Sequence, residues 1–200
     1  MTKKKSTFPA RKITVTAILA ALSSALMFLS FPVPLMPGFI KFDFSELPAL
    51  LGSFALGPWY GVAICLVKNL VNMLKTQTGC IGELANFILG SVFVGVAGAV
   101  YKRKKTRKRA FFGSLAGAVS MTLIGIASNY FIIYPIYAKM MPMEVILGMY
   151  QTILPGVDTL LQALLIFNAP FTFIKGMINV LITFLIYKKV APVLKGIDRT

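Results

Sequence analysis

The sequence predicts an all-α integral membrane protein with six transmembrane helices and both termini in the cytoplasm. Of the 200 residues, 57% are hydrophobic and only 14% are charged, whereas roughly 25% of the residues in soluble domains are charged. The apolar runs are longer than the roughly ten-residue strands of a membrane barrel, and several approach the roughly 20 residues that a spanning helix needs. No stretch remains for a soluble domain, so residues 1–200 are predicted to form a single membrane domain.

Basic residues gather in three short segments beside the predicted spans. These segments hold 16 of the 21 Lys and Arg residues: a tail at residues 1–12, a loop at residues 102–109 and the stretch after residue 187. Lysine and arginine are enriched in short cytoplasmic loops, so all three segments are predicted to face the cytoplasm and its anionic lipid. Nucleic acid is not a predicted partner despite the net charge of +15, because the basic loop has no interleaved aromatic residues.

The predicted spans occupy residues 13–30, 45–56, 59–74, 83–101, 110–134 and 168–187. Between them lie a proline-rich outer loop at residues 31–44 and a long outer segment at residues 139–167. Gly57 and Pro58 form a tight turn. The last span is predicted to begin near Asn168, with Pro170 in its first turn, where proline is tolerated; the residues before it either extend or precede this span.

A polar stripe runs along the last predicted span. Asn168, Thr172, Lys175 and Asn179 share one face of a helix. Polar side chains inside a membrane helix are costly and normally face protein or a cavity. The stripe therefore predicts one wall of a small-molecule site, and the ionisable Lys175 favours this over the alternative of hydrogen bonds that merely hold neighbouring helices together. Asn129, in the fifth span, must also find a polar partner.

Lys68 lies deep in the third predicted span and cannot easily reach water. A buried lysine requires a polar partner, and Glu46 and Glu83 are the candidates. An ion pair is favoured over a ligand contact. Asp43 and Glu46 are interpreted as capping the second span and complementing its helix dipole.

Two further sets of residues predict contacts. Ala17, Ala21 and Ala25 recur at every fourth position of the first span, a spacing of small residues that lets another helix approach closely. An ordinary alanine-rich helix is the alternative. Phe39, Phe42 and Phe44 in the outer loop are either interfacial anchors or a lid over a ligand.

The sequence lacks the residue patterns of common catalytic sites. It has no histidine, which removes the commonest metal ligand and general base. Cys65 lies in a span and Cys80 in an outer loop, so neither a disulfide nor a metal site is predicted. There is no phosphate-binding loop, and the six carboxylates form no close pair. These absences favour a non-enzymatic binding subunit that takes its energy from a partner, with a stand-alone facilitator or enzyme as the alternative.

Several motifs in order resemble the substrate-binding S components of energy-coupling factor (ECF) vitamin transporters, most closely the riboflavin-specific members. The motifs are Phe31-Pro32-Val33-Pro34, Phe42-Asp43-Phe44-Ser45-Glu46-Leu47-Pro48, Phe54-Ala55-Leu56-Gly57-Pro58, Val67-Lys68-Asn69-Leu70, Ala85-Asn86-Phe87, Asn129-Tyr130-Phe131 and Pro170-Phe171-Thr172-Phe173-Ile174-Lys175-Gly176. The resemblance implies an S-component-like bundle in the bacterial plasma membrane. It implies riboflavin as the transported ligand, with FMN left open, and no catalytic cofactor. An S component for another vitamin is the closest alternative.

The resemblance also implies roles for particular residues and partners. The pocket would face outward beneath the loop after span one, and the subunit would dock on a transmembrane coupling subunit and two cytoplasmic ATPases. The face formed by Ala17, Ala21 and Ala25 resembles the docking surface. Thr172 departs from the asparagine expected in many relatives, and Asn168 one turn away can compensate. The predicted ligand-binding residues are Phe42, Phe44, Asn129, Asn168, Thr172 and Lys175.

Overall fold

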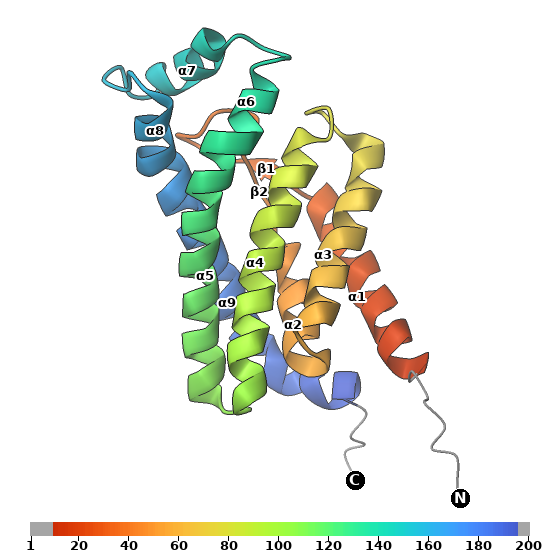
Figure 1. Ribbon diagram of the computed structural model, residues 1–200. Coiled ribbons are helices and arrows are strands. Elements are labelled where there is room, and N and C mark those ends of the chain that lie inside the picture. Colours follow the sequence, from red (N-terminus) through yellow and green to blue (C-terminus); the bar gives the residue numbers. More distant parts are fainter. Residues whose placement is uncertain (1–9, 196–200) are drawn as a thin grey trace, which may run out of the picture.

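The computed structural model describes residues 10–195, apart from the side chains of Lys188, Lys189 and residues 191–195. Long helices run side by side in a bundle (Figure 1). The described chain begins and ends at the lower end of Figure 1, together with the turn that carries the basic loop at residues 102–109. Most of the predicted basic tail, and the basic side chains after residue 187, lie outside what is described.

The elements follow one another with short connections. In chain order they are α1 (Ala10–Phe28), β1 (Phe31–Pro32), β2 (Lys41–Phe42), α2 (Glu46–Leu56), α3 (Pro58–Asn72), the 3₁₀ turn η1 (Met73–Lys75), α4 (Ile81–Arg103), α5 (Arg107–Ser128), the π-helical turn η2 (Asn129–Ile133), α6 (Tyr134–Tyr137), α7 (Met143–Gln151), α8 (Leu160–Ala163), the π-helical turn η3 (Leu164–Asn168) and α9 (Ala169–Lys195). The predicted turn between α2 and α3 is present, and Gly57 adopts a φ of +122° there, a conformation that favours glycine.

Helices lie at all six predicted positions, but they differ in length. Four stretches in the described chain are long and apolar enough to cross a bilayer: Ala10–Phe28, Ile81–Arg103, Arg107–Tyr137 and Leu160–Tyr187. With 11 and 15 residues, α2 and α3 are shorter than the roughly 20 residues of a typical span. The protein is therefore a mostly helical, multi-pass membrane protein, while the count of six spans and the cytoplasmic placement of the termini stay predictions.

The last span starts earlier than its predicted first residue. Residues before Asn168 extend the helix back to Leu160, so Pro170 lies within a continuous helical stretch. A proline inside a helix cannot donate its backbone hydrogen bond and its ring crowds the preceding turn. The π-helical turn η3 ends two residues before Pro170 and widens the helix there. Pro135 follows η2 in the same way.

Close contacts between α4 and α5 fix the centre of the bundle. Gly113 and Gly117 of α5 face the backbone of α4, and a methyl group on Gly117 would lie 2.6 Å from the carbonyl oxygen of Phe93. Only glycine permits this approach, as expected for membrane helices that associate through small residues. The surrounding core is apolar and includes the fully buried Phe93 and Val94.

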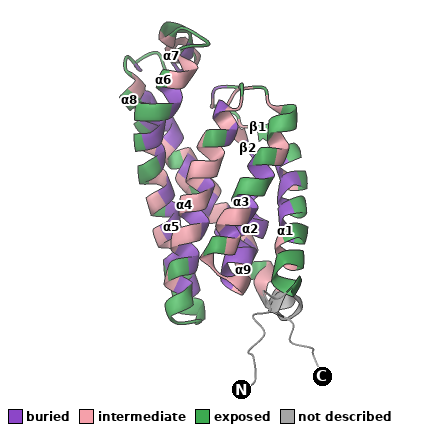
Figure 2. Ribbon diagram, turned by 45° about the vertical axis from the view of Figure 1, so that its right-hand side comes forward, coloured by how far each residue is buried: buried purple, intermediate pink, exposed green. Residues whose placement is uncertain are grey.

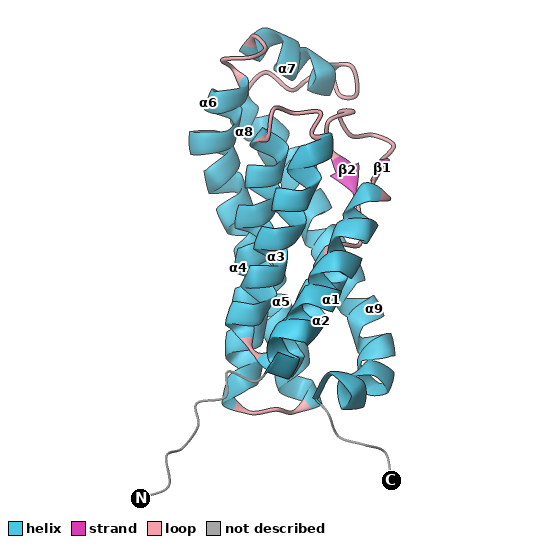
Figure 3. Cartoon of the chain, turned by 90° about the vertical axis from the view of Figure 1, so that its right-hand side faces the viewer, coloured by secondary structure: helices cyan, strands magenta, loops and turns pink. Residues whose placement is uncertain are grey.

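The end of the bundle opposite the termini is closed by short elements. β1 and β2 pair in antiparallel fashion, and α7 lies across the top in Figures 1 and 3. At the other side of the bundle, α1 packs against α3 and α2, and its outward side is exposed along much of its length (Figure 2). The fold thus leaves one open helix face and one covered end.

Candidate functional site

A cavity of about 540 Å³ lies beneath the outer loop. Its walls come from the end of α1, residues 38–41 and Asp43 of that loop, the first residue of α2, the connection between α3 and α4, and residues of α4, α5, η2, α6, η3 and α9. The volume falls within the roughly 300–1,000 Å³ of typical small-molecule sites. A pocket built from this many separate elements is suited to hold a ligand of vitamin size.

Four of the six predicted ligand-binding residues line this cavity: Asn129, Asn168, Thr172 and Lys175. The other two do not. The Phe42 ring packs against the rings of Phe44 and Phe171 at centroid distances of 5.1 and 6.3 Å, and of these three only Phe171 lines the cavity. The structure therefore brings the polar set together and places Phe42 behind an aromatic wall residue.

The amide of Asn168 is held in one orientation by two tyrosines. Its Oδ1 accepts a hydrogen bond from the Tyr150 hydroxyl at 2.8 Å, and its Nδ2 donates to the Tyr134 hydroxyl at 3.3 Å. The two hydroxyls also bond to each other. Burial raises the pKa of Tyr150, which keeps the hydroxyl protonated. Since α7 contributes Tyr150, the outermost helix takes part in shaping the cavity.

Other polar groups in the cavity remain available to a ligand. Within residues 10–195, the side chains of Asn129 and Thr172 make no hydrogen bond, although each residue is only 9% exposed. Asn86 also lines the cavity, and its buried Oδ1 has no partner in the same range. Buried amides and hydroxyls normally find a hydrogen-bond partner. These three side chains are consequently ready to bond with a polar ligand.

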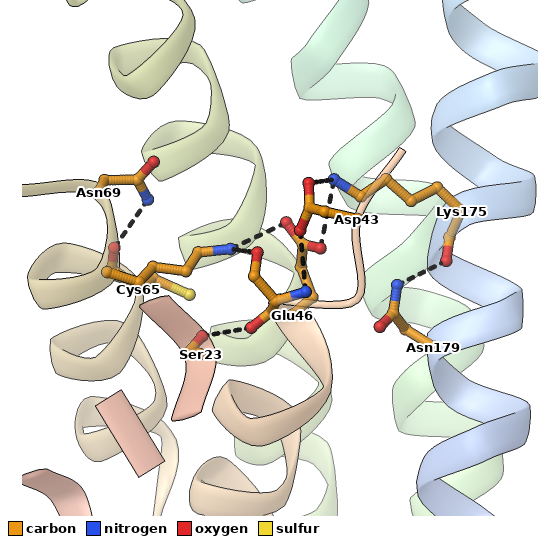
Figure 4. A network of polar contacts seen from close by, with 9 residues as sticks. Ser23, Asp43, Glu46, Cys65, Asn69, Lys175 and Asn179 are labelled. Carbon is orange, nitrogen blue, oxygen red and sulfur yellow. Dashed lines mark hydrogen bonds and ion pairs between the residues drawn. The ribbon is translucent and has the colours of Figure 1, made fainter. Parts of the chain in front are cut away.

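Three ion pairs join four charged residues in a chain (Figure 4), and all but Lys68 line the cavity. The Lys175 ammonium lies 2.9 Å from Asp43 Oδ2 and 3.3 Å from Glu46 Oε2, and the Lys68 ammonium lies 3.1 Å from Glu46 Oε1. Lys68 also donates to the Ser45 hydroxyl at 2.5 Å. We call Asp43, Glu46, Lys68 and Lys175 the charge cluster. Its two positive and two negative charges balance.

The charge cluster changes the interpretation of its acidic residues. The predicted ion pair of Lys68 is confirmed, with Glu46 rather than Glu83 as its partner. Glu46 does lie in the first turn of α2, yet its charge is shared between two lysines. Asp43 accepts a hydrogen bond from the backbone of Ser45 through one oxygen and bonds Lys175 through the other. The cap of α2 at Ser45 uses no side-chain hydrogen bond, so the predicted capping by Asp43 is not observed, while Glu46 takes the predicted place in the first turn.

Asp43 stays ionised in its buried position. Burial raises its pKa. The positive charges of Lys175 and Lys68, together with the hydrogen bonds from Ser45 and Lys175, outweigh this effect and lower the pKa to about 2. The carboxylate therefore keeps its charge and its hold on Lys175 at neutral pH. The sequence position directly after β2 makes Asp43 the link between the outer loop and α9.

A third buried carboxylate, Glu83, lies elsewhere on the cavity wall. It accepts hydrogen bonds from Asn72 Nδ2 and Thr76 Oγ1 at 2.9 Å each, and from Thr78 Oγ1 at 3.3 Å. No lysine or arginine in the described chain forms an ion pair with it. The sequence made Glu83 one of two candidate partners for Lys68, and Lys68 pairs with the other, Glu46. The available signal was the run of polar residues between α3 and α4.

The family model "ECF transporter, substrate-specific component" matches residues 11–187 of this chain. The chain belongs to the substrate-specific (S) components of ECF transporters. This confirms the predicted resemblance. The S component is 32% identical to the riboflavin transporter RibU of Staphylococcus aureus over 187 residues, which cover 94% of each chain. It is 28% identical to the riboflavin transporter FmnP of Bacillus subtilis over 185 residues, covering 91% of this chain and 93% of that protein.

A solved structure agrees with these sequence relatives. The S component superposes with a TM-score of 0.73 and 32% identity on a chain described under "Structure and mechanism of the S component of a bacterial ECF transporter", covering 93% of this chain and 98% of the other. The relatives are named as transporters, which confirms the prediction of a transport role without enzymatic activity. The S-component fold is thus established over almost the whole chain.

Proposed function

We propose that this S component is the riboflavin-binding membrane subunit of an ATP-driven ECF importer in the bacterial plasma membrane. The observation that carries the proposal is the cavity, where Asn129, Asn168, Thr172 and Lys175 meet. The names of the relatives supply the ligand, since two full-length relatives are called riboflavin transporters.

The chemistry of the cavity suits a flavin. An isoalloxazine is flat and aromatic, with donors and acceptors along one edge, so it needs apolar walls and a few placed polar groups. Phe39, Tyr134 and Phe171 offer aromatic surface. Asn129 and Thr172 offer free donors and acceptors. FMN, which adds a phosphate, is a further ligand to test.

The topology follows from charge. We propose six spans with both termini in the cytoplasm, because the basic loop at residues 102–109 lies at the end where α1 begins and α9 ends. The outer loop at residues 31–44 and the segment at residues 139–167 then face outward and cover the cavity. In this arrangement the whole chain is one membrane domain that captures its substrate from outside.

The docking surface is proposed to be the open face of α1. Ala17, Ala21 and Ala25 are all exposed, whereas Ala20 and Ser24 on the same helix are buried against the bundle. Exposed small residues at this spacing allow another membrane helix to pack closely. We propose that the transmembrane coupling subunit packs here and that two cytoplasmic ATPases supply the energy.

Binding is tested with the purified, detergent-solubilised protein. Titration of riboflavin, followed by quenching of flavin fluorescence, should give saturable binding with one ligand per chain. FMN, biotin and thiamine titrated in parallel distinguish riboflavin from the alternative of another vitamin. Saturable binding of biotin or thiamine, with none of riboflavin, contradicts the proposal.

Docking is tested separately from binding. Ala21→Trp places a bulky ring on the proposed docking face and should abolish riboflavin uptake by cells that also express the coupling subunit and ATPases, while riboflavin binding by the purified variant is retained. Leu123→Trp, at a position on α5 that is 61% exposed, is the matched control and should leave both unchanged. Normal uptake by Ala21→Trp would place the docking face elsewhere.

A further inference from the structure

The charge cluster contains one residue that cannot touch a ligand. Lys68 is fully buried and does not line the cavity. Its ammonium lies between the Ser45 hydroxyl and Glu46 Oε1. Glu46 reaches across to Lys175 through its other oxygen. Lys68 therefore contacts the one cationic cavity residue of α9 only through a shared carboxylate.

Lys175 has donor capacity left over. An ammonium group carries three N–H donors, and the two carboxylates of the cluster engage at most two of them. The side chain is 11% exposed, and the residue lines the cavity. The remaining N–H is thus the one that a ligand can accept from, and its direction depends on where Asp43 and Glu46 hold the nitrogen.

The balance of charge explains why a second lysine is needed. With Lys68 removed, two carboxylates would compete for one ammonium in a buried site, and an unpaired buried charge is strongly unfavourable. Glu46 would then be free to move toward Lys175 or to draw in water. With Lys68 present, Oε1 of Glu46 is occupied and Oε2 faces Lys175.

We infer that Lys68 is a positioning residue: by occupying one oxygen of Glu46, it keeps that carboxylate from drawing the ammonium of Lys175 away from the ligand cavity. This inference rests on the proposed riboflavin-binding function. Asp43 takes part in the same arrangement, because it follows β2 directly and its ion pair connects the outer loop to Lys175. The charge cluster thereby fixes the positions of the outer loop, α2, α3 and α9 relative to one another beside the ligand.

The test uses charge rescue in the full chain. Riboflavin affinity is measured for Lys68→Met, for Glu46→Gln and for the double variant, each on folded, monodisperse protein. Lys68→Met leaves an excess negative charge and should weaken binding by about tenfold or more. The double variant restores neutrality and should recover affinity to within about threefold of the unmodified chain, which is far from additive. Lys139→Met and Glu144→Gln, both at exposed positions outside the cavity, are the matched controls.

Each outcome either supports or overturns the inference about Lys68. If Lys68→Met binds riboflavin as tightly as the unmodified chain and only melts at a lower temperature, Lys68 is structural and the inference is wrong. A double variant as weak as the product of the two single variants also overturns it. If Lys68→Met does not fold, Lys68→Gln, which removes the charge but keeps a hydrogen-bond donor for Ser45, is measured in its place against the same outcomes. Failure of the unmodified chain to bind riboflavin contradicts the proposed function itself, which is distinct from these results.

Discussion

Two buried carboxylate sites lie on the same cavity and are stabilised in different ways. Glu46 shares its charge with two lysines from α3 and α9, so its partners come from distant parts of the chain. Glu83 is surrounded by neutral donors from residues 72–78, which immediately precede it in sequence. The first arrangement connects helices, whereas the second organises a local turn. The difference indicates that the charge cluster sets the geometry of the bundle and the Glu83 site only that of the cavity rim.

The largest expected effect is at the centre of the charge cluster. Glu46→Ala leaves two buried lysines facing a single carboxylate. Breaking a buried ion pair costs about 3–5 kcal/mol, and the variant should unfold at a much lower temperature in detergent. Glu144→Ala, at an exposed position, should melt like the unmodified protein. Equal melting temperatures for Glu46→Ala and the control would mean that the cluster does not connect the helices.

The second effect should be smaller because the Glu83 site has no ionic partner. Glu83→Gln keeps the shape and one acceptor, but its amide nitrogen meets donors where an oxygen accepted them. Loss of a buried hydrogen bond costs about 1–3 kcal/mol. The melting temperature should fall less than in Glu46→Ala. A larger fall at Glu83 would reverse the comparison and make the rim the dominant site.

One ion pair of the charge cluster could be predicted from sequence, as one of two alternatives, whereas the contacts of Lys175 with Asp43 and Glu46 and those at the cavity rim could not. A lysine as deep as Lys68 requires a partner, and helical periodicity alone places Thr172 and Lys175 on one face. The signal for the Glu83 site was weak, because a run of short polar residues between two helices is equally typical of a solvent-exposed loop. Its burial depends on how the outer loop and α6 pack over it, which sequence spacing does not encode.

The aromatic residues show the same limit. Of Phe39, Phe42 and Phe44, the three loop residues predicted as anchors or a lid, only Phe39 lines the cavity, together with Phe28 and Phe171. Alternation along an extended segment cannot say which side faces the cavity when both sides are covered. The turns η2 and η3, in contrast, had a usable signal in Pro135 and Pro170, since proline inside an apolar helix disturbs the turn before it.

A third prediction concerns Tyr134, Tyr150 and Asn168, whose side chains form hydrogen bonds with one another beside the cavity. Tyr150→Phe removes the donor to Asn168 Oδ1 while the ring stays packed against Phe39 and Phe167. The free energy of unfolding should fall by about 1 kcal/mol. Riboflavin affinity should also fall, because the Asn168 amide is then held by Tyr134 alone. Tyr130→Phe, on the exposed side of η2, should change neither; a drop in stability without any change in affinity would remove Tyr150 from the binding site.

The smallest expected effect tests whether the charge cluster reaches α1. Ser23 is fully buried, and its hydroxyl donates to the backbone carbonyl of Ser45, the residue that also bonds Lys68. Ser23→Ala should lower the free energy of unfolding by about 0.5–1.5 kcal/mol. Ser24→Ala is the matched control, because the Ser24 hydroxyl bonds only Ala20 of its own helix at 2.9 Å and its loss should cost little.

The pair of serine variants separates two views of α1. If Ser23→Ala is destabilised and Ser24→Ala is not, the hydrogen bond of Ser23 stabilises the packing of α1 against the charge cluster. The helix that carries the exposed alanines is then connected to the cavity through Ser45. Equal effects in thermal unfolding would leave α1 held by apolar packing alone. In that case only the packing contacts of α2 and α3 with α1 would connect the cavity to the proposed docking face.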